Sequence, residues 1–304
     1  MTAELGSHDQ PPPPGATAPT RWGPGHRLRH AVSTRAFQWL ARRKVITNRP
    51  GEQFRIVEHT LRLPGLPVDL DGLRVAHLSD LHVGRLLRPD HLRPIVDAVN
   101  LARPDLIANT GDMLDYSNRY LGEVVDAIAR LDAPLGVYSV LGNHDHRDNA
   151  AAVARAFQRR GLNLLVNQAA YVHARRHALA VAGIDWAEND HELRRLVHRA
   201  CGGLHGDDLR LLLAHHPHAL DPAQHHGVDL VLSGHTHGGQ FVFRKSRTHE
   251  RESLGLGNLN FRYPQGHYQR GPTHLFVTNG LGSSFPLRFR CPPEVSLLTL
   301  RPGG

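Results

Sequence analysis

Short apolar segments of strand length alternate with amphipathic segments of helix length along this 304-residue chain. A helix whose apolar face must be covered packs against a neighbouring sheet, so this alternation favours sheets with helices outside them. The later part of the chain is mainly strand-like, which adds sheet without adding helices. The sequence therefore predicts an α/β (α+β) fold, a sandwich of mixed sheets with helices on the outer faces. Strands are expected in 74–79, 105–110, 135–142, 163–184, 210–215, 228–234, 273–280 and 294–300.

Helices are expected between these strands, in 88–102, 117–131, 148–161 and 189–200. The segment from Arg244 to Gly271 is polar and Gly-rich without a clear period, so we expect a long loop there. We find no internal repeat.

The N-terminal region differs in composition from the rest of the chain. Residues 1–26 are rich in Pro and Gly and predict a disordered tail. Residues 27–50 place apolar side chains at helical spacing between arginines, which suits a helix on an anionic membrane surface or one docked on the protein itself. Residues 51–304 are expected to form one enzyme domain. The apolar positions of the basic segment are Leu28, Val32, Ala36, Trp39 and Leu40.

The net charge of +8 is concentrated in that same region. Residues 1–50 hold 8 Lys/Arg and 2 Asp/Glu, a surplus of 6, whereas the remainder holds 28 and 26, a surplus of 2. The high isoelectric point therefore does not argue for a nucleic-acid-binding domain. Without a long apolar run or a disulfide framework, since Cys201 and Cys291 stand alone, a cytoplasmic location fits, peripheral to the inner face of the membrane if residues 27–50 bind it.

Five of the predicted strands end in Asp, Asn or His. In α/β sheets, ligands bind outside the carboxyl ends of the strands, so these residues are expected to meet in one site. Residues two apart in extended backbone point to the same side, which would aim His235 and His237 at one point. The five strand ends carry Asp80 and His82; Asp112 and Asp115; Asn143, His144 and Asp145; His215 and His216; and His235 and His237.

Imidazole and carboxylate together suit Mn, Fe, Zn, Ni or Co, of which we favour Mn. About seven donors are too many for one ion and suit two, with Asp112 placed to bridge them. Paired metal ions stabilise both the attacking and the leaving oxygens of a phosphoryl displacement and acidify a bridging water. The residues thus predict a binuclear metal centre.

The blocks Asp80-x-His82, Gly111-Asp112, Gly142-Asn143-His144-Asp145, His215 and Gly234-His235-Thr236-His237 resemble those of the calcineurin-like metallophosphoesterases. The stretches GHTHGGQ and NGLGSSFPLRFRCPPEVSLLTL are further similar to the bacterial branch typified by the YaeI and YkuE phosphodiesterases. The resemblance covers residues 55 to 301 and implies a four-layer α-β-β-α sandwich with the metal site at the carboxyl ends of the strands.

The resemblance also implies a role for each matching residue. Asp80, His82 and His237 would bind the first metal ion, and Asn143, His215 and His235 the second. Asp112 would bridge them. His144 would contact the scissile phosphate, together with Asn143, and protonate the leaving oxygen. Asp115 would orient His144, while Gln240 is a further substrate-binding candidate.

Several alternatives stay open at this point. Asp80 and Asp112 could be helix N-caps. His216 competes with His215, His146 with His144, and Asp145 with Asp115.

The function predicted is hydrolysis of a phosphoester, by preference a phosphodiester, through in-line attack of a metal-bridging hydroxide. The alternatives are a metal-dependent amide or lactone hydrolase, and a catalytically weak, membrane-tethered scaffold with the same fold.

Overall fold

The structure is a computed structural model, and it describes residues 53–204, 209–240, 261–284, 288 and 291–303, with the backbone alone of 242–244 and 254–255. The predicted tail, 1–26, and the basic segment, 27–50, lie outside the described residues, so both stay predictions.

Two six-stranded sheets form the centre of the described chain. The first runs in the order β1 (Arg55–Leu63), β14 (Glu294–Pro302), β2 (Arg74–Leu78), β3 (Leu106–Asn109), β4 (Val137–Ser139) and β5 (Asn163–Leu164). The second runs in the order β12 (Gly266–Arg270), β13 (Thr273–Val277), β9 (Leu230–Ser233), β8 (Leu209–Leu213), β7 (His177–Gly183) and β6 (Gln168–Ala174).

Both sheets are mixed. The strands β2 to β5 are parallel, while β14 pairs antiparallel with β2 and parallel with β1. In the second sheet β7, β8, β9 and β13 are parallel, and the edge strands β6 and β12 are antiparallel to their neighbours. Neighbouring parallel strands end at the same edge of a sheet. The carboxyl ends of β2, β3 and β4 therefore lie at one edge of the first sheet, and those of β8 and β9 lie at one edge of the second.

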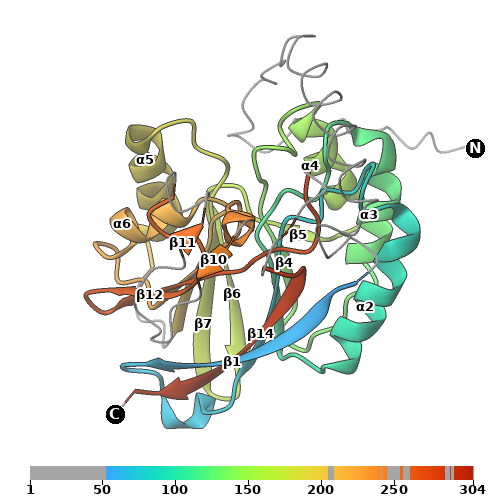
Figure 1. Cartoon of the computed structure of the whole chain (residues 1–304). Helices are drawn as coiled ribbons and strands as arrows, with labels where there is room; N and C mark the ends of the chain where they lie inside the picture. Colours follow the sequence, from blue (N-terminus) through green and yellow to red (C-terminus); the bar gives the residue numbers. More distant parts are fainter. Residues whose placement is uncertain are drawn as a thin grey trace, which may run out of the picture.

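Helices cover the outer face of each sheet (Figure 1). The first sheet packs against α2 (Leu92–Leu101), α3 (Leu121–Ile128) and α4 (Ala150–Arg159), and the second against α5 (Asp190–Cys201) and α6 (Leu220–Ala223). A separate apolar layer lies between the two sheets. The predicted α-β-β-α sandwich is therefore confirmed. Short 3-10 turns complete the elements: η1 (Val68–Leu70), η2 (Pro89–His91), η3 (Asn118–Tyr120), η4 (Pro217–Ala219) and η5 (His237–Gly239).

The central strands are mostly apolar because both of their faces are buried. In β9, Leu230 and Leu232 point into the layer between the sheets, whereas Val231 points toward the helices of the second sheet. In β3, Ala108 faces the inner layer and Ile107 the helices of the first sheet. Because side chains alternate between the two faces of a strand, each short strand contributes both to the layer between the sheets and to the layer beneath the helices.

Helix starts follow from local sequence as well. The Asn149 side chain accepts a hydrogen bond from Ala152 N at the start of α4, and that of Asn189 accepts one from Glu192 N at the start of α5. Such caps satisfy backbone donors that a helix leaves unpaired. Neither Asp80 nor Asp112 caps a described helix.

Two parts of the expected organisation need correction. The segment from Arg244 to Gly271 is not one long loop, because β12 forms an antiparallel hairpin with β13, and β10 (Val242–Arg244) pairs with β11 (Leu254–Gly255). The polar sequence of β12 suits its half-buried place at a sheet edge. The edge strand β1, also half exposed along most of its length, was not assigned from the sequence. Within the described part of the chain, every helix is too short or too polar to cross a bilayer.

Leu211 in β8 is fully buried between the sheets. We expect Leu211→Ala to lower the free energy of unfolding by about 2–5 kcal/mol, because it removes apolar contacts and leaves a cavity. Chemical denaturation measures this change. Leu101→Ala is the matched control, since Leu101 is 81% exposed at the end of α2. Equal effects of the two substitutions would contradict the assigned inner layer.

Candidate metal centre

The loops that follow five strands meet at one edge of the sandwich. Asp80 N donates to Gly111 O at 2.9 Å, and His82 N donates to Asp112 O at 2.9 Å, which ties the loop after β2 to the loop after β3. Gly234 N donates to His215 O at 3.2 Å, which ties the loops after β8 and β9. Backbone hydrogen bonds thus fix the positions from which the candidate side chains project.

The backbone at these positions is left-handed rather than extended, a conformation that side chains other than Gly adopt at a cost and that clusters at functional sites. Strand alternation therefore does not pair His235 with His237, and that explanation was wrong. The strand β9 ends at Ser233, and each of the two histidines turns toward a different carboxylate. The values of φ are 54° for Asp80, 45° for His82, 52° for Asp112, 71° for His235 and 51° for His237.

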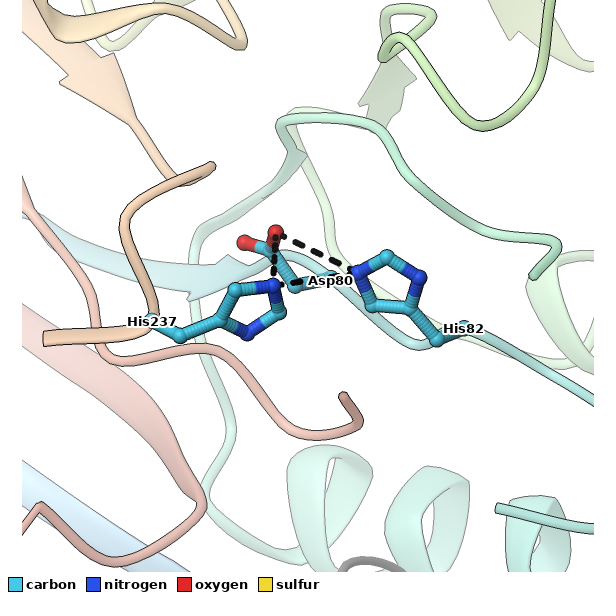
Figure 2. Close-up of side chains that lie close together, drawn as sticks. All are labelled: Asp80, His82 and His237. Carbon is cyan, nitrogen blue, oxygen red and sulfur yellow. Dashed lines mark hydrogen bonds and ion pairs between the residues drawn. The ribbon is translucent and has the colours of Figure 1, made fainter. Parts of the chain in front are cut away.

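Asp80, His82 and His237 form a first cluster (Figure 2). The two Nε2 atoms lie 3.2 Å apart, and Asp80 Oδ1 lies 3.7 Å from His82 Nε2 and 3.5 Å from His237 Nε2. Two imidazole nitrogens bound to one tetrahedral ion at about 2.1 Å are roughly 3.4 Å apart. The spacing of the three ligand atoms therefore fits one cation.

Asp112, His215 and His235 form a second cluster. His215 Nε2 lies 3.2 Å from Asp112 Oδ2 and 3.2 Å from His235 Nδ1. His215 Nδ1 lies 2.7 Å from the carbonyl oxygen of Thr110, which can only accept a hydrogen bond. The proton of neutral His215 is therefore on Nδ1, and Nε2 presents its lone pair to the cluster.

Asp112 joins the two clusters. Its Oδ2 atom lies 3.5 Å from His82 Nε2 and 3.2 Å from His215 Nε2. Its other oxygen accepts a hydrogen bond from His144 N at 2.7 Å, so the carboxylate is held in this orientation. One carboxylate oxygen therefore lies beside ligand atoms of both clusters.

Asn143 supplies a further test of whether the site fits a metal ion. Its Oδ1 atom is buried and has no hydrogen-bond partner among the described residues. Burying an amide oxygen without a partner is unfavourable, unless a ligand such as a cation completes its contacts. The backbone on either side reaches the bridging region, since His144 N binds Asp112 and a Cβ on Gly142 would collide with Asp112 Oδ1.

Glycines allow the carboxylates to approach the backbone this closely. The Gly142 position has no room for a Cβ beside Asp112, and a Cβ on Gly234 would collide with Ser79 Oγ and Asp80 Oδ2. The glycines that precede Asn143 and His235 are therefore required by close packing.

Asp115 and Asp145 have different contacts, and only Asp115 is bound to the His144 side chain. His144 Nδ1 lies 2.7 Å from Asp115 O and 3.4 Å from Asp115 Oδ1. The Asp145 carboxylate instead accepts hydrogen bonds from the backbone N–H groups of Met113, Leu114 and Gly142. Asp115 thus lies where it can orient His144, mainly through its carbonyl, while Asp145 holds loops together.

The other competing residues lie at the margin of the site. His146 Nε2 pairs with Asp185 Oδ1 at 2.6 Å. His216 accepts a hydrogen bond from His218 N and caps the turn η4, with its ring 5.2 Å from that of His235. Gln240 Nε2 donates to Ser283 Oγ at 2.9 Å. None of these three residues belongs to the first or the second cluster.

The carboxylates of the clusters favour positive charge at two of the four histidines, whereas burial lowers the pKa of the other two. Burial lowers the pKa of His82, but the carboxylates of Asp115, Asp80 and Asp112 outweigh it and raise the pKa to about 10. Burial also lowers the pKa of His215, but the Asp112 carboxylate outweighs this effect and raises the pKa to about 9. Burial would raise the pKa of Asp112, yet the neighbouring histidines hold it well below its usual range. Carboxylates this buried create the negative potential that a cation site needs.

Three residues near the site were missed in the sequence analysis. Ser284 Oγ donates to Asp115 Oδ1 at 2.6 Å and lies 3.3 Å from His82 Nδ1. The fully buried Arg288 has its Nη2 atom 3.2 Å from His237 Nδ1. The Trp186 ring lies 5.2 Å from that of His235. Trp186 follows the end of β7, so a search of the residues after each predicted strand could have found it. Ser284 and Arg288 come from a loop without such a signal.

Known proteins are similar to this chain in sequence. The calcineurin-like phosphoesterase family model matches residues 73–239. The uncharacterized metallophosphoesterase YkuE of Bacillus subtilis is 31% identical over 255 residues, 80% of this chain and 84% of YkuE. The phosphodiesterase YaeI of Escherichia coli is 28% identical over 263 residues, 81% of this chain and 88% of YaeI. A solved dimetal phosphatase from Danio rerio is 14% identical, covers 69% of this chain and 88% of its own, and has a TM-score of 0.41, too low to support any argument.

The family match spans β2 to η5, and so includes both clusters, the shared carboxylate and the Asn143–His144 pair. The similarity to the two relatives covers 80% and 81% of the chain. The resemblance inferred from the sequence blocks is confirmed, and the chain belongs to the calcineurin-like phosphoesterase family.

Proposed function

We propose that this chain is a phosphodiesterase with a binuclear metal centre. The observation that carries the proposal is the position of Asp112 Oδ2, between His82 Nε2 at 3.5 Å and His215 Nε2 at 3.2 Å. One ion would be held by Asp80, His82 and His237. The other would be held by Asn143, His215 and His235, and Asp112 would bind both ions. Membership of a phosphoesterase family favours phosphoester hydrolysis over the amide and lactone alternatives.

Bound cations would neutralise the phosphoryl oxygens and make a water molecule a better nucleophile near neutral pH. We favour Mn, although nitrogen and oxygen donors of this kind accept several transition metals. Support for a diester rather than a monoester comes from YaeI, a relative named as a phosphodiesterase.

His144 is the proposed acid. Its Nδ1 proton is held by the Asp115 carbonyl oxygen at 2.7 Å, so Nε2 is the atom available to the substrate. Burial lowers the pKa of His144, and the negative charge of a bound phosphate would raise it again. As the water oxygen bonds to phosphorus and the bond to the leaving alcohol breaks, His144 would protonate the alcohol oxygen. Asn143 and Gln240 stay substrate-binding proposals.

Substitution of the proposed acid and the shared carboxylate tests this function. We expect His144→Ala to lower kcat for bis(2-hydroxyethyl) phosphate by about 10²–10⁴-fold with Mn²⁺ present, because the alkoxide leaving group of this diester needs the proton that His144 would supply. Asp112→Asn should lose activity and also bind fewer metal ions per chain, as counted by elemental analysis. The exposed His191→Ala and Asp97→Asn are matched controls. Full turnover by a chelated, metal-free sample would refute the proposal.

Metal binding should also release protons. With pKa values of about 10 and 9, His82 and His215 are protonated at pH 7.5, and a protonated nitrogen cannot bind a metal ion. Binding must therefore displace both protons, and the apparent affinity should rise with pH, by roughly tenfold per pH unit for each proton released. Calorimetric titration in buffers of different ionisation enthalpy measures the number released. Heats that do not depend on the buffer would contradict this prediction.

We further propose that residues 27–50 attach the protein to an anionic membrane surface, on the composition of that segment alone. Deleting residues 1–50 should lower binding to vesicles that contain phosphatidylglycerol while leaving turnover of a soluble diester unchanged. Co-sedimentation measures the binding. Equal binding by the full chain and the deleted form would rule out this attachment.

A further inference from the structure

A pocket of about 370 Å³ lies beside His144. Its walls come from residues 83–86, which follow β2, from residues 115–117, 119 and 120, which follow β3, and from Ser284. None of the seven candidate metal-binding residues lines it. Pockets that bind small ligands have volumes of about 300–1,000 Å³, so this one suits a compact group rather than a polymer.

The pocket is continuous with the environment of His144. Three of its lining residues contact that histidine: the Asp115 carbonyl oxygen lies 2.7 Å from Nδ1, Ser284 Oγ lies 3.4 Å from the same atom, and the Tyr116 ring centroid lies 5.4 Å from that of His144. His144 is proposed to protonate the leaving oxygen. That oxygen would contact Nε2, at the other edge of the same imidazole, so the group that it carries would extend around the ring to enter this pocket.

The charged groups of the pocket favour an anion. Arg85 and Arg119 line it, and the Arg119 guanidinium lies 5.2 Å from the ring centroid of Tyr120, which also lines it. A third guanidinium, of Arg147, lies 4.5 Å from the Tyr116 ring centroid. Asp115, whose carboxylate faces Ser284, His82 and His144, is the one carboxylate among the lining residues described. Guanidinium groups bind phosphate oxygens through paired hydrogen bonds.

We propose that this pocket binds the leaving group of the substrate, and that the leaving group is an alcohol carrying a second phosphate. The assignment rests on the proposed phosphodiesterase function. Arg85 and Arg119 bind the second phosphate, and Val83, Leu86 and the Tyr120 ring contact the carbon part of the alcohol. Hydrolysis adds water across the bond between phosphorus and the alcohol oxygen. The products are a phosphomonoester and the phosphorylated alcohol, whose new hydroxyl proton comes from His144.

Two symmetric diesters test the proposal, since either bond that breaks then releases the same alcohol. They are bis(2-phosphooxyethyl) phosphate and bis(2-hydroxyethyl) phosphate, which differ in the second phosphate. We expect kcat/KM of the Mn-loaded wild-type protein to be higher for the first diester by at least about tenfold, the size of effect expected of a charge-assisted contact. Phosphorus NMR follows the release of product.

Substitution of both arginines should remove this preference. In Arg85→Gln/Arg119→Gln the ratio of the two kcat/KM values should fall close to one. Arg93→Gln is the matched control, because Arg93 is an exposed arginine on α2 that does not line the pocket, and it should keep the wild-type ratio. A ratio near one in the wild-type protein, or equal loss of the ratio in the control, would overturn the assignment.

Binding of the released alcohol separates failure of the pocket from failure of the function. Calorimetry with 2-hydroxyethyl phosphate and chelated, metal-free protein should show binding that the double substitution weakens about tenfold and Arg93→Gln leaves unchanged. If bis(p-nitrophenyl) phosphate is hydrolysed but the ethyl diesters show no preference, the pocket assignment fails and the function stands. If no diester is hydrolysed, the function fails. If neither ethyl diester is hydrolysed, the binding of 2-hydroxyethyl phosphate tests the pocket assignment by itself. Absence of that binding would overturn the proposal.

Discussion

A single carboxylate oxygen joins the two halves of the candidate site. Asp112 Oδ2 lies within 3.5 Å of histidines from opposite sheets, His82 after β2 and His215 after β8. Asp112 is 1% exposed, so its negative charge is stabilised by what surrounds it rather than by water. The two sheets must therefore be held at a fixed separation for the site to exist, and the apolar layer between them provides that constraint.

The loops around Asp112 adopt conformations that their own sequences do not favour. Asp80, His82, Asp112, His235 and His237 all have left-handed backbone, which is unfavourable for residues with a Cβ. Hydrogen bonds between neighbouring loops and close packing at Gly142 and Gly234 hold them there. The rigid strands beneath supply the stability that these loops lack. Such a site is organised before substrate arrives, which is what electrostatic catalysis requires.

Two regions with different chemistry adjoin at His144. On one side lie the buried histidines and carboxylates, whose potential attracts cations. On the other lies the pocket lined by Arg85 and Arg119, whose charges attract anions. Asp115 and Ser284 belong to both regions, since they contact His144 and line the pocket. A substrate with a phosphate at each region would be held across the bond to be broken, which places the leaving oxygen near His144.

From the amino-acid sequence we predicted most of the central strands and the four longer helices, the family, and the set of chemically capable residues. Those follow from local patterns: apolar runs with a period of two or 3.6, and polar residues where strands end. It could not show the polar edge strand β12, since a half-exposed strand has no apolar signature. The fold assigned His235 and His237 to different clusters, and it placed Asp115 rather than Asp145 beside His144. The fold also brought Ser284 and Arg288 to the site. These outcomes depend on left-handed loop backbones and on contacts between residues as much as 202 positions apart, as between Ser284 and His82, which no local pattern encodes.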